Sequence, residues 1–101
     1  MRRTRAQGRK DANHKELVAY WLTLPGTSWQ DTCEIPGALD GIAGCNGVDV
    51  RIEIKDGSKP PSGRKLTDAE RMTIDNWTGR KPIIWLKIGN VQATYDLLVP
   101  F

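Results

Sequence analysis

The sequence predicts a small α/β domain built around a mixed β-sheet. Three observations predict this class: an apolar helical stripe near the N-terminus, a strictly alternating segment in the middle of the chain, and a helix-opening motif after it. A chain of 101 residues is long enough for one hydrophobic core but short for two. The expected order of elements is α-β-β-β-α-β with a short tail, which places helices against a mixed sheet.

The first predicted helix covers residues 13–24. Its large apolar side chains follow the i, i+3, i+4, i+7 spacing of one helical face: Leu17, Tyr20, Trp21 and Leu24. Asp11 or Asn13 is placed to cap its start, and the Pro-Gly pair at residues 25–26 is expected to end it. A short strand over residues 28–32 follows.

A β-hairpin is the clearest local feature of the chain. Residues 48–55 (VDVRIEIK) alternate strictly, with apolar side chains on one face of the strand and charged side chains on the other. The Asn-Gly pair at residues 46–47 is a strong signal for a two-residue turn, so residues 37–45 are the expected partner strand. In the register that such a turn sets, Asp40 lies opposite Glu53.

A loop and a second helix are expected after the hairpin. Residues 56–65 (DGSKPPSGRK) are turn formers and bases without an apolar member. Thr67 and Glu70 then have the capping-box spacing that opens a helix. This helix is expected to run to residue 77 or 78 and to stop at Gly79.

The C-terminal part of the chain predicts one more strand. Residues 82–88 (PIIWLKI) form an apolar run of strand length, and the Gly-Asn pair at residues 89–90 is expected to turn the chain. Residues 91–98 fit a short helix and a strand equally well, so their conformation stays open at this point.

Basic residues are concentrated in two places. Residues 1–10 carry five bases and no acid, so we expect a disordered arm that contacts nucleic acid, followed by a single domain over residues 11–101; the five bases are Arg2, Arg3, Arg5, Arg9 and Lys10. The whole chain holds 15 bases and 12 acids, so the domain by itself has ten bases against twelve acids. The loop at residues 56–65 with its neighbour Lys55 is basic again, and Lys59, Arg64 and Lys65 are expected to bind phosphates. The alternative for this loop is an ordinary solvated segment.

Several classes of protein are excluded by composition. No apolar run approaches the roughly 20 residues of a membrane-spanning helix, and the basic N-terminus is not followed by the apolar stretch of a secretory signal. The two cysteines, Cys33 and Cys45, lack a CxxC spacing, and with one histidine in the chain a structural zinc site is not expected. A reduced, cytoplasmic protein is the simplest interpretation.

The pairing of Asp40 with Glu53 is the feature that carries chemistry. Directly opposed Cβ atoms of an antiparallel pair lie about 4.5–5.5 Å apart, so two carboxylates there repel each other unless a cation compensates. Lys55 lies on the same face, and Mg²⁺, which takes carboxylate ligands and polarises phosphoryl oxygens, would compensate further. This pattern predicts a phosphodiesterase centre. The alternative is a solvated strand face with ordinary cross-strand ion pairs, in a register that can slip by one residue.

Asp40 followed by Glu53-Ile54-Lys55 resembles the D…(D/E)xK signature of the PD-(D/E)XK nuclease superfamily. The residues after it, DGSKPPS and the Leu-Thr pair at 66–67, are similar to small phage and prophage members, the VRR-NUC group and related Holliday-junction-resolvase-like nucleases. The opening DANHKE at residues 11–16, followed by the apolar helix, is also similar to that group. The resemblance spans about residues 11–88.

This resemblance implies a fold, an activity and partners. The fold would be a restriction-endonuclease-like αβββαβ core with a central mixed sheet. The activity would be that of a Mg²⁺-dependent DNA endonuclease, with Mn²⁺ able to substitute, selective for Holliday junctions or other branched DNA. The protein would act as a homodimer, in the host cytoplasm if it is phage-encoded.

The resemblance also assigns roles to residues. Asp40, Glu53 and the backbone carbonyl of Ile54 would hold the metal, and Glu16 on the first helix would complete or tune that site. Lys55 would activate the attacking water or stabilise the pentacovalent phosphate. The chain departs from the family pattern at Leu39, where a proline is common, and at Glu70, where a glutamine is common; Glu70 is expected either to cap its helix or to lie near the site and alter its charge.

Other functions remain open at the level of sequence. A nucleic-acid-binding module that keeps the nuclease fold without catalysis is the main alternative, and an interaction protein without any response to divalent metal is a third. The four tryptophans are expected mainly in the core, with Trp77 as the best candidate for stacking on a base: Trp21, Trp29, Trp77 and Trp85. His14 is expected at the surface at the start of the first helix.

Overall fold

A four-stranded mixed sheet forms the centre of the computed structural model, which describes residues 11–99. The elements along the chain are α1 (His14–Thr23), β1 (Thr27–Asp31), β2 (Gly41–Cys45), β3 (Val48–Ile54), the 3₁₀ helix η1 (Pro61–Arg64), α2 (Asp68–Asp75), β4 (Ile83–Trp85) and α3 (Ile88–Leu98). The predicted arm, with Arg2, Arg3, Arg5, Arg9 and Lys10, lies outside the described residues. The predicted order α-β-β-β-α-β is therefore confirmed, with one further helix after it.

The strands lie side by side in the order of the sequence. β1 pairs with β2 and β2 with β3 in antiparallel fashion, whereas β3 and β4 are parallel. Asn46 and Gly47 both have positive φ angles, 57° and 79°, as a two-residue hairpin turn that follows the strand twist requires. This turn sets the predicted register, since Cys45 pairs with Val48 and Gly41 with Ile52.

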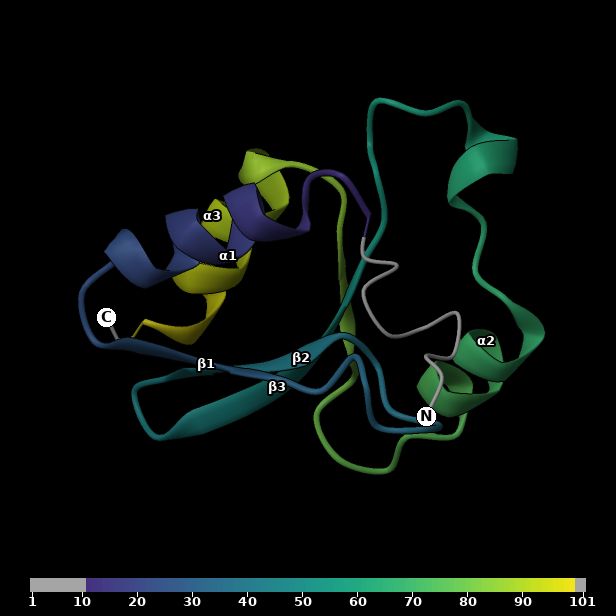
Figure 1. Cartoon of the computed structure of the whole chain (residues 1–101). Helices are drawn as coiled ribbons and strands as arrows, with labels where there is room; N and C mark the ends of the chain where they lie inside the picture. The colour runs from purple at the N-terminus through teal and green to yellow at the C-terminus, as the bar shows by residue number, and fades with distance from the viewer. Residues whose placement is uncertain (1–10, 100–101) are drawn as a thin grey trace.

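The hydrophobic core lies between one face of the sheet and the helices α1 and α3, which pack side by side on that face (Figure 1). The predicted helical stripe points into it: Leu17 and Trp21 are fully buried, and Tyr20 and Leu24 pack against the core at its edge. The apolar face of β3 meets them with Val50, Ile52 and Ile54, each at most 1% exposed. The alternation along residues 48–55 thus predicted the buried face of the strand correctly.

Two tryptophans fill the centre of this core. The ring centroids of Trp21 and Trp85 are 5.6 Å apart, and Trp29 stacks on Trp85 at 5.5 Å. Burial of an indole also requires a partner for its N–H group. Trp21 donates to the carbonyl of Ser28 at 2.8 Å, and Trp85 donates to the hydroxyl of Thr94 at 2.9 Å. The large aromatic area is therefore buried without leaving an unpaired donor.

The start of α3 corrects the expectation for residues 82–90. The predicted turn at Gly89 and Asn90 is wrong, because both residues belong to the first turn of α3. The side chain of Asn90 accepts hydrogen bonds from the backbone N–H groups of Leu86 and Lys87, at 2.9 and 3.0 Å, and this fixes the start of the helix. Leu86 and Lys87 therefore leave the sheet, and β4 is shorter than predicted.

Two helix ends also differ from the prediction. α2 ends at Asp75 instead of running to residue 77 or 78, because the N–H groups of Asn76 and Trp77 already close the last turn on Met72 and Ile74. Asn13 occupies the cap position of α1, but its side chain does not cap that helix. Its amide group instead donates to two backbone carbonyls, that of Lys55 at 3.1 Å and that of Leu86 at 2.9 Å. Asn13 thus ties the start of α1 to the ends of β3 and β4.

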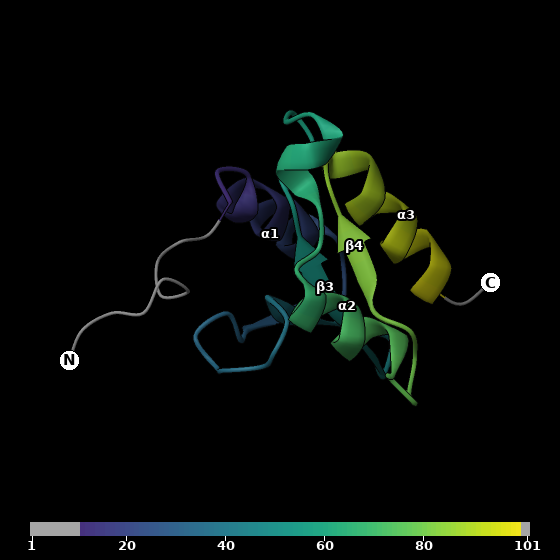
Figure 2. The ribbon, with the colours of Figure 1, turned by 90° about the vertical axis from the view of Figure 1, so that its right-hand side faces the viewer.

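The second helix lies apart from the other two. Figures 1 and 2 show α2 beyond the end of the sheet that α1 and α3 leave free, after a loop that extends away from β3 and returns. The charged side chains of β3 lie on the face of the sheet opposite to the core with α1 and α3. Over residues 11–99, none of the helices has the length and apolar character that a membrane crossing requires.

Candidate functional site

Asp40 is fixed at the point where β2 begins. Its backbone N–H donates to the carbonyl of Ile52 at 3.0 Å, and its own carbonyl accepts from the N–H of Thr32 at 2.9 Å. One carboxylate oxygen, Oδ2, accepts a hydrogen bond from the N–H of Ile54 at 2.8 Å. Asp40 therefore lies across the end of β3, beside Glu53, as the hairpin register predicts.

The backbone carbonyl of Ile54 is directed to the same place. The N–H of Lys55, in the same peptide group, donates to Trp85 of β4 at 3.0 Å. The C=O and N–H of a trans peptide point in opposite directions, and no described residue follows a cis bond. The carbonyl of Ile54 therefore points away from β4 and toward the side of β3 on which Asp40 lies.

Glu53 is a buried acid on the charged face of β3. It is only 4% exposed, although the residue at the other end of this face, Asp49, is exposed to solvent. Burial, together with the charge of Asp40 and the hydrogen bond and charge of Glu70, raises the pKa of Glu53 to about 9. The face of β3 is therefore not uniformly solvated, because its carboxyl-terminal half is covered.

Glu70 reaches this place from α2. The hydroxyl of Thr67 accepts from the N–H of Glu70 at 3.1 Å, and Oε1 of Glu70 accepts from the N–H of Thr67 at 2.9 Å, so the predicted capping box is present. The same Oε1 lies 2.9 Å from Nζ of Lys55, whereas Oε2 of Glu53 lies 3.7 Å from Nζ. Glu70 therefore both caps its helix and alters the charge of the site, the two roles that the sequence left open.

Lys55 is held as a cation by its neighbours. Burial alone lowers the pKa of Lys55, but the hydrogen bond and charge of Glu70 and the charge of Glu53 outweigh this effect and raise the pKa above its ordinary value. For Glu70, burial raises the pKa, but hydrogen bonds from Glu53, from the Thr67 N–H and from Lys55 lower it overall. The proton between the two glutamates therefore belongs to Glu53, and Lys55 and Glu70 form the charged pair.

The environment of Asp40 includes a residue that sequence reasoning placed wrongly. Burial raises the pKa of Asp40, against the lowering effects of the Ile54 N–H and of His14. His14 is not a surface residue, since it is 4% exposed, with Nε2 3.4 Å from Oδ2 of Asp31. The helical period does carry a signal for this, because His14 lies three residues before Leu17 and seven before Trp21 and so continues the buried stripe of α1. The ring of Trp29 packs against His14 with the ring centroids 6.1 Å apart.

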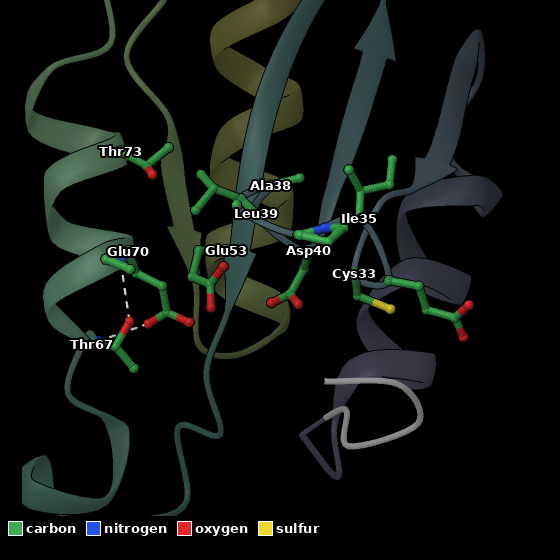
Figure 3. Close-up of a pocket in the computed structure, with 13 residues that line it drawn as sticks. Cys33, Ile35, Ala38, Leu39, Asp40, Glu53, Thr67, Glu70 and Thr73 are labelled. Atoms are coloured by element: carbon green, nitrogen blue, oxygen red, sulfur yellow. Dashed lines mark hydrogen bonds between the residues drawn. The ribbon is translucent and has the colours of Figure 1, made fainter. Parts of the chain in front are cut away.

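A pocket of about 420 Å³ opens in front of these acids. Asp40, Glu53 and Glu70 line it together, and in Figure 3 Glu53 lies between the other two side chains. The rest of the lining is the segment before β2, residues 33–39, and the first turns of α2. The pocket therefore lies between the carboxyl-terminal end of β3, the segment before β2 and α2.

Other residues assigned a role from the sequence lie elsewhere. Glu16 is exposed on α1 and lines a different pocket, together with Asp56 and Lys87, so the structure does not bring it to Asp40 and Glu53. In the loop after β3, Lys59 and Lys65 are exposed, and Arg64 is partly buried, with Nη1 3.5 Å from the carbonyl of Gly57. In the sequence these bases lie between Glu53 and Thr67, which line the pocket of acids, but none of the three lines it.

The acids of the pocket have the chemistry of a hard-cation site. Two carboxylates and a backbone carbonyl are oxygen ligands of the kind that Mg²⁺ and Mn²⁺ take. Within residues 11–99, no group of three or more His, Cys, Asp or Glu side chains could hold a metal ion by itself or with other ligands, so a cation here would rest on fewer side chains. The remaining ligands would then be the carbonyl, water and a phosphate oxygen, which is the usual situation for Mg²⁺. Burial and the charges of Asp40 and Glu70 raise the pKa of Glu53, although the charge of Lys55 acts in the opposite direction.

Comparisons with protein-family models, with curated proteins and with solved structures found no match to this chain.

Proposed function

We propose that this protein is a metal-dependent DNA endonuclease that hydrolyses phosphodiester bonds, with a core of the restriction-endonuclease type. One observation carries the proposal: Asp40 and Glu53 are held beside each other in a pocket, next to the ammonium group of Lys55. Burying two acids together destabilises a fold, so an arrangement that keeps both is expected to serve a cation.

The fold supports the same proposal. The resemblance implies an αβββαβ core, and the chain follows this order, with two antiparallel pairs and one parallel pair in the sheet. Glu53 and Lys55 come from the carboxyl-terminal end of β3, and Asp40, which directly precedes β2, lies beside them.

Each residue of the site has a role in phosphodiester hydrolysis. Asp40, Glu53 and the Ile54 carbonyl would hold a divalent cation, which as a Lewis acid stabilises the charge that develops on the phosphate. Lys55 carries a proton at neutral pH, so it donates hydrogen bonds to the phosphate or to the attacking water and does not act as the base. Glu70 holds Nζ of Lys55 on the pocket side of β3.

Glu70 also provides for the change of charge when a cation enters. Burial and the nearby acids raise the pKa of Glu53, whereas the pKa of Glu70 is lowered overall by hydrogen bonds from Glu53, from the Thr67 N–H and from Lys55. A divalent cation held by Glu53 would favour the carboxylate form of this residue. Lys55 would stay paired with Glu70, whose Oε1 lies 2.9 Å from Nζ.

The test is a cleavage assay with four labelled DNA substrates. Four-way junction, flap, duplex and single-stranded DNA are incubated with Mg²⁺, with Mn²⁺ and with a chelator. We expect cleavage of at least one substrate with either metal and none with the chelator. Lys55→Ala and Glu53→Gln are expected to lower the rate at least 100-fold, as loss of a transition-state interaction does. Asp96→Asn, which changes an exposed acid on α3, serves as the matched control.

The outcomes separate this function from its alternatives. Binding of DNA without metal-dependent cleavage of any substrate would establish the non-catalytic module instead. Cleavage that survives both Lys55→Ala and Glu53→Gln would remove the assigned roles. The choice between junction, flap and duplex follows from the relative rates on the four substrates.

A further inference from the structure

A second groove adjoins the pocket of acids. Its volume is about 360 Å³, and its lining is mainly apolar, with Arg51 as its charged member and Trp77 as its aromatic member. Five lining residues are common to both hollows: Pro36, Gly37, Ala38, Leu39 and Thr73. The two hollows are therefore neighbours on one surface of the molecule.

The charged and aromatic members of the lining come from β3 and from the end of α2. Arg51 lies on the charged face of β3, two residues before Glu53, so the alternation of the strand puts both side chains on the same side of the sheet. On α2, Glu70 and Thr73 are three residues apart and thus on one helical face, and Trp77 follows in the turn that closes the helix. Thr73 lines both hollows, whereas Glu70 lines only the pocket of acids and Trp77 lines only the groove.

Arg51 and Trp77 are in direct contact in the lining of the groove. The guanidinium carbon lies 4.6 Å from the centroid of the Trp77 ring, which is the geometry of a cation–π contact. Both side chains are partly buried, and the ion pairs described within residues 11–99 give Arg51 no carboxylate partner. The pair therefore places an aromatic ring and a guanidinium group together in the lining of the groove.

We propose that this groove binds an unpaired nucleobase of the DNA strand whose backbone enters the neighbouring pocket. The proposal rests on the proposed function, because that function puts a DNA strand in the pocket. A base has two flat faces that stack on an aromatic ring or a guanidinium plane, and its phosphate is attracted by the free charge of Arg51. A fully paired duplex keeps its bases stacked within the helix, so this groove would favour branched or single-stranded DNA.

The test measures binding in the presence of a chelator, so that no cleavage is needed. The probe is a DNA strand with one 2-aminopurine, either single-stranded or at the unpaired position of a flap, and its fluorescence is followed as protein is added. Stacking in the groove is expected to change the 2-aminopurine signal. Trp77→Ala is expected to weaken binding of these probes roughly 5- to 100-fold, the range for loss of one stacked base, and to leave a fully paired duplex unaffected.

Three further variants make the result specific. Trp77→Phe keeps an aromatic face and is expected to restore most of the affinity, whereas Arg51→Met removes the charge and is expected to weaken binding without abolishing stacking. Met72→Ala, which changes an exposed side chain of α2 outside the groove, is the matched control. Thermal unfolding of each variant excludes loss of the fold as the cause.

Two results would overturn the inference. The first is an equal loss of affinity for duplex and single-stranded probes in Trp77→Ala, which would mean a general effect on DNA binding. The second is an unchanged 2-aminopurine signal, which is expected if the groove binds an apolar side chain of a protein. Base stacking in the groove without metal-dependent cleavage would support the base-binding groove and refute the endonuclease. Metal-dependent cleavage of a flap that Trp77→Ala and Arg51→Met leave unchanged would support the endonuclease and refute the base-binding groove.

Discussion

Replacing Glu53 by glutamine is expected to stabilise the metal-free protein and to abolish its stabilisation by metal. The pKa of Glu53 rises from 4.5 to about 9 on folding, so the folded protein holds a proton that the unfolded chain has released at neutral pH. The stability contributed by this acid is fully present below pH 4.5 and is lost as the pH rises toward 9. Glutamine cannot ionise, and its amide can still donate a hydrogen bond to Glu70.

The expected gain in stability depends on how far pH 7 lies above 4.5, the pKa of Glu53 in the unfolded chain. Between 4.5 and pH 7 the cost grows over about 2.5 pH units at about 1.4 kcal/mol per unit, which gives roughly 3.5 kcal/mol as an upper value. Glu53→Gln is therefore expected to be more stable than the original protein by about 1–3 kcal/mol at pH 7. In a domain of this size each kcal/mol raises the unfolding temperature by about 4–8 °C.

The assay is urea or thermal unfolding, followed by tryptophan fluorescence, at several pH values between 5 and 9. With chelator, the advantage of Glu53→Gln should grow as the pH rises. With Mn²⁺ at about 100 times its dissociation constant, the original protein should gain about 2.7 kcal/mol and the variant nothing, so the order of stability is reversed or equalised. A variant that is less stable with chelator at pH 8, with no pH-dependent difference, would show that Glu53 is simply the ionised partner of Lys55 and would refute this reasoning.

Three other changes test the fold and the arm. Gly41→Ala would place a Cβ atom 2.1 Å from the indole of Trp29, so we expect a loss of about 1–3 kcal/mol in urea unfolding, together with weaker metal binding through the adjacent Asp40; unchanged stability would mean that Trp29 can move. Asn13→Ala removes the two hydrogen bonds that join α1 to β3 and β4, and a loss of about 1–3 kcal/mol is expected in the same assay. Deletion of residues 1–10 is expected to weaken DNA binding and to reduce its dependence on salt, while cleavage at low salt continues; loss of that cleavage would make the arm part of the site.

Local geometry explains which elements could be predicted. The Asn46-Gly47 turn and the period of two along β3 fix the register without help from the rest of the chain, so Asp40 was correctly expected beside Glu53. The capping box of α2 is equally local, because it joins residues only three apart. The turn predicted at Gly89 and Asn90 is wrong, although the pair has the composition of a turn. The side chain of Asn90 accepts hydrogen bonds from the N–H groups of Leu86 and Lys87, and the pair lies in the first turn of a helix.

The sequence by itself determined the order of the elements, the buried face of β3 and the pairing of Asp40 with Glu53, since each depends on neighbours along the chain or across one tight turn. Only the tertiary structure decided that Glu53 is buried, that Glu70 holds Lys55, and that Glu16 stays away. The physical reason is the loop between β3 and α2, whose path sets where α2 approaches the sheet. Because α2 approaches the sheet there, Asp40 and Glu53 are covered and Lys55 is paired with Glu70. Arg51 and Trp77 line the neighbouring groove.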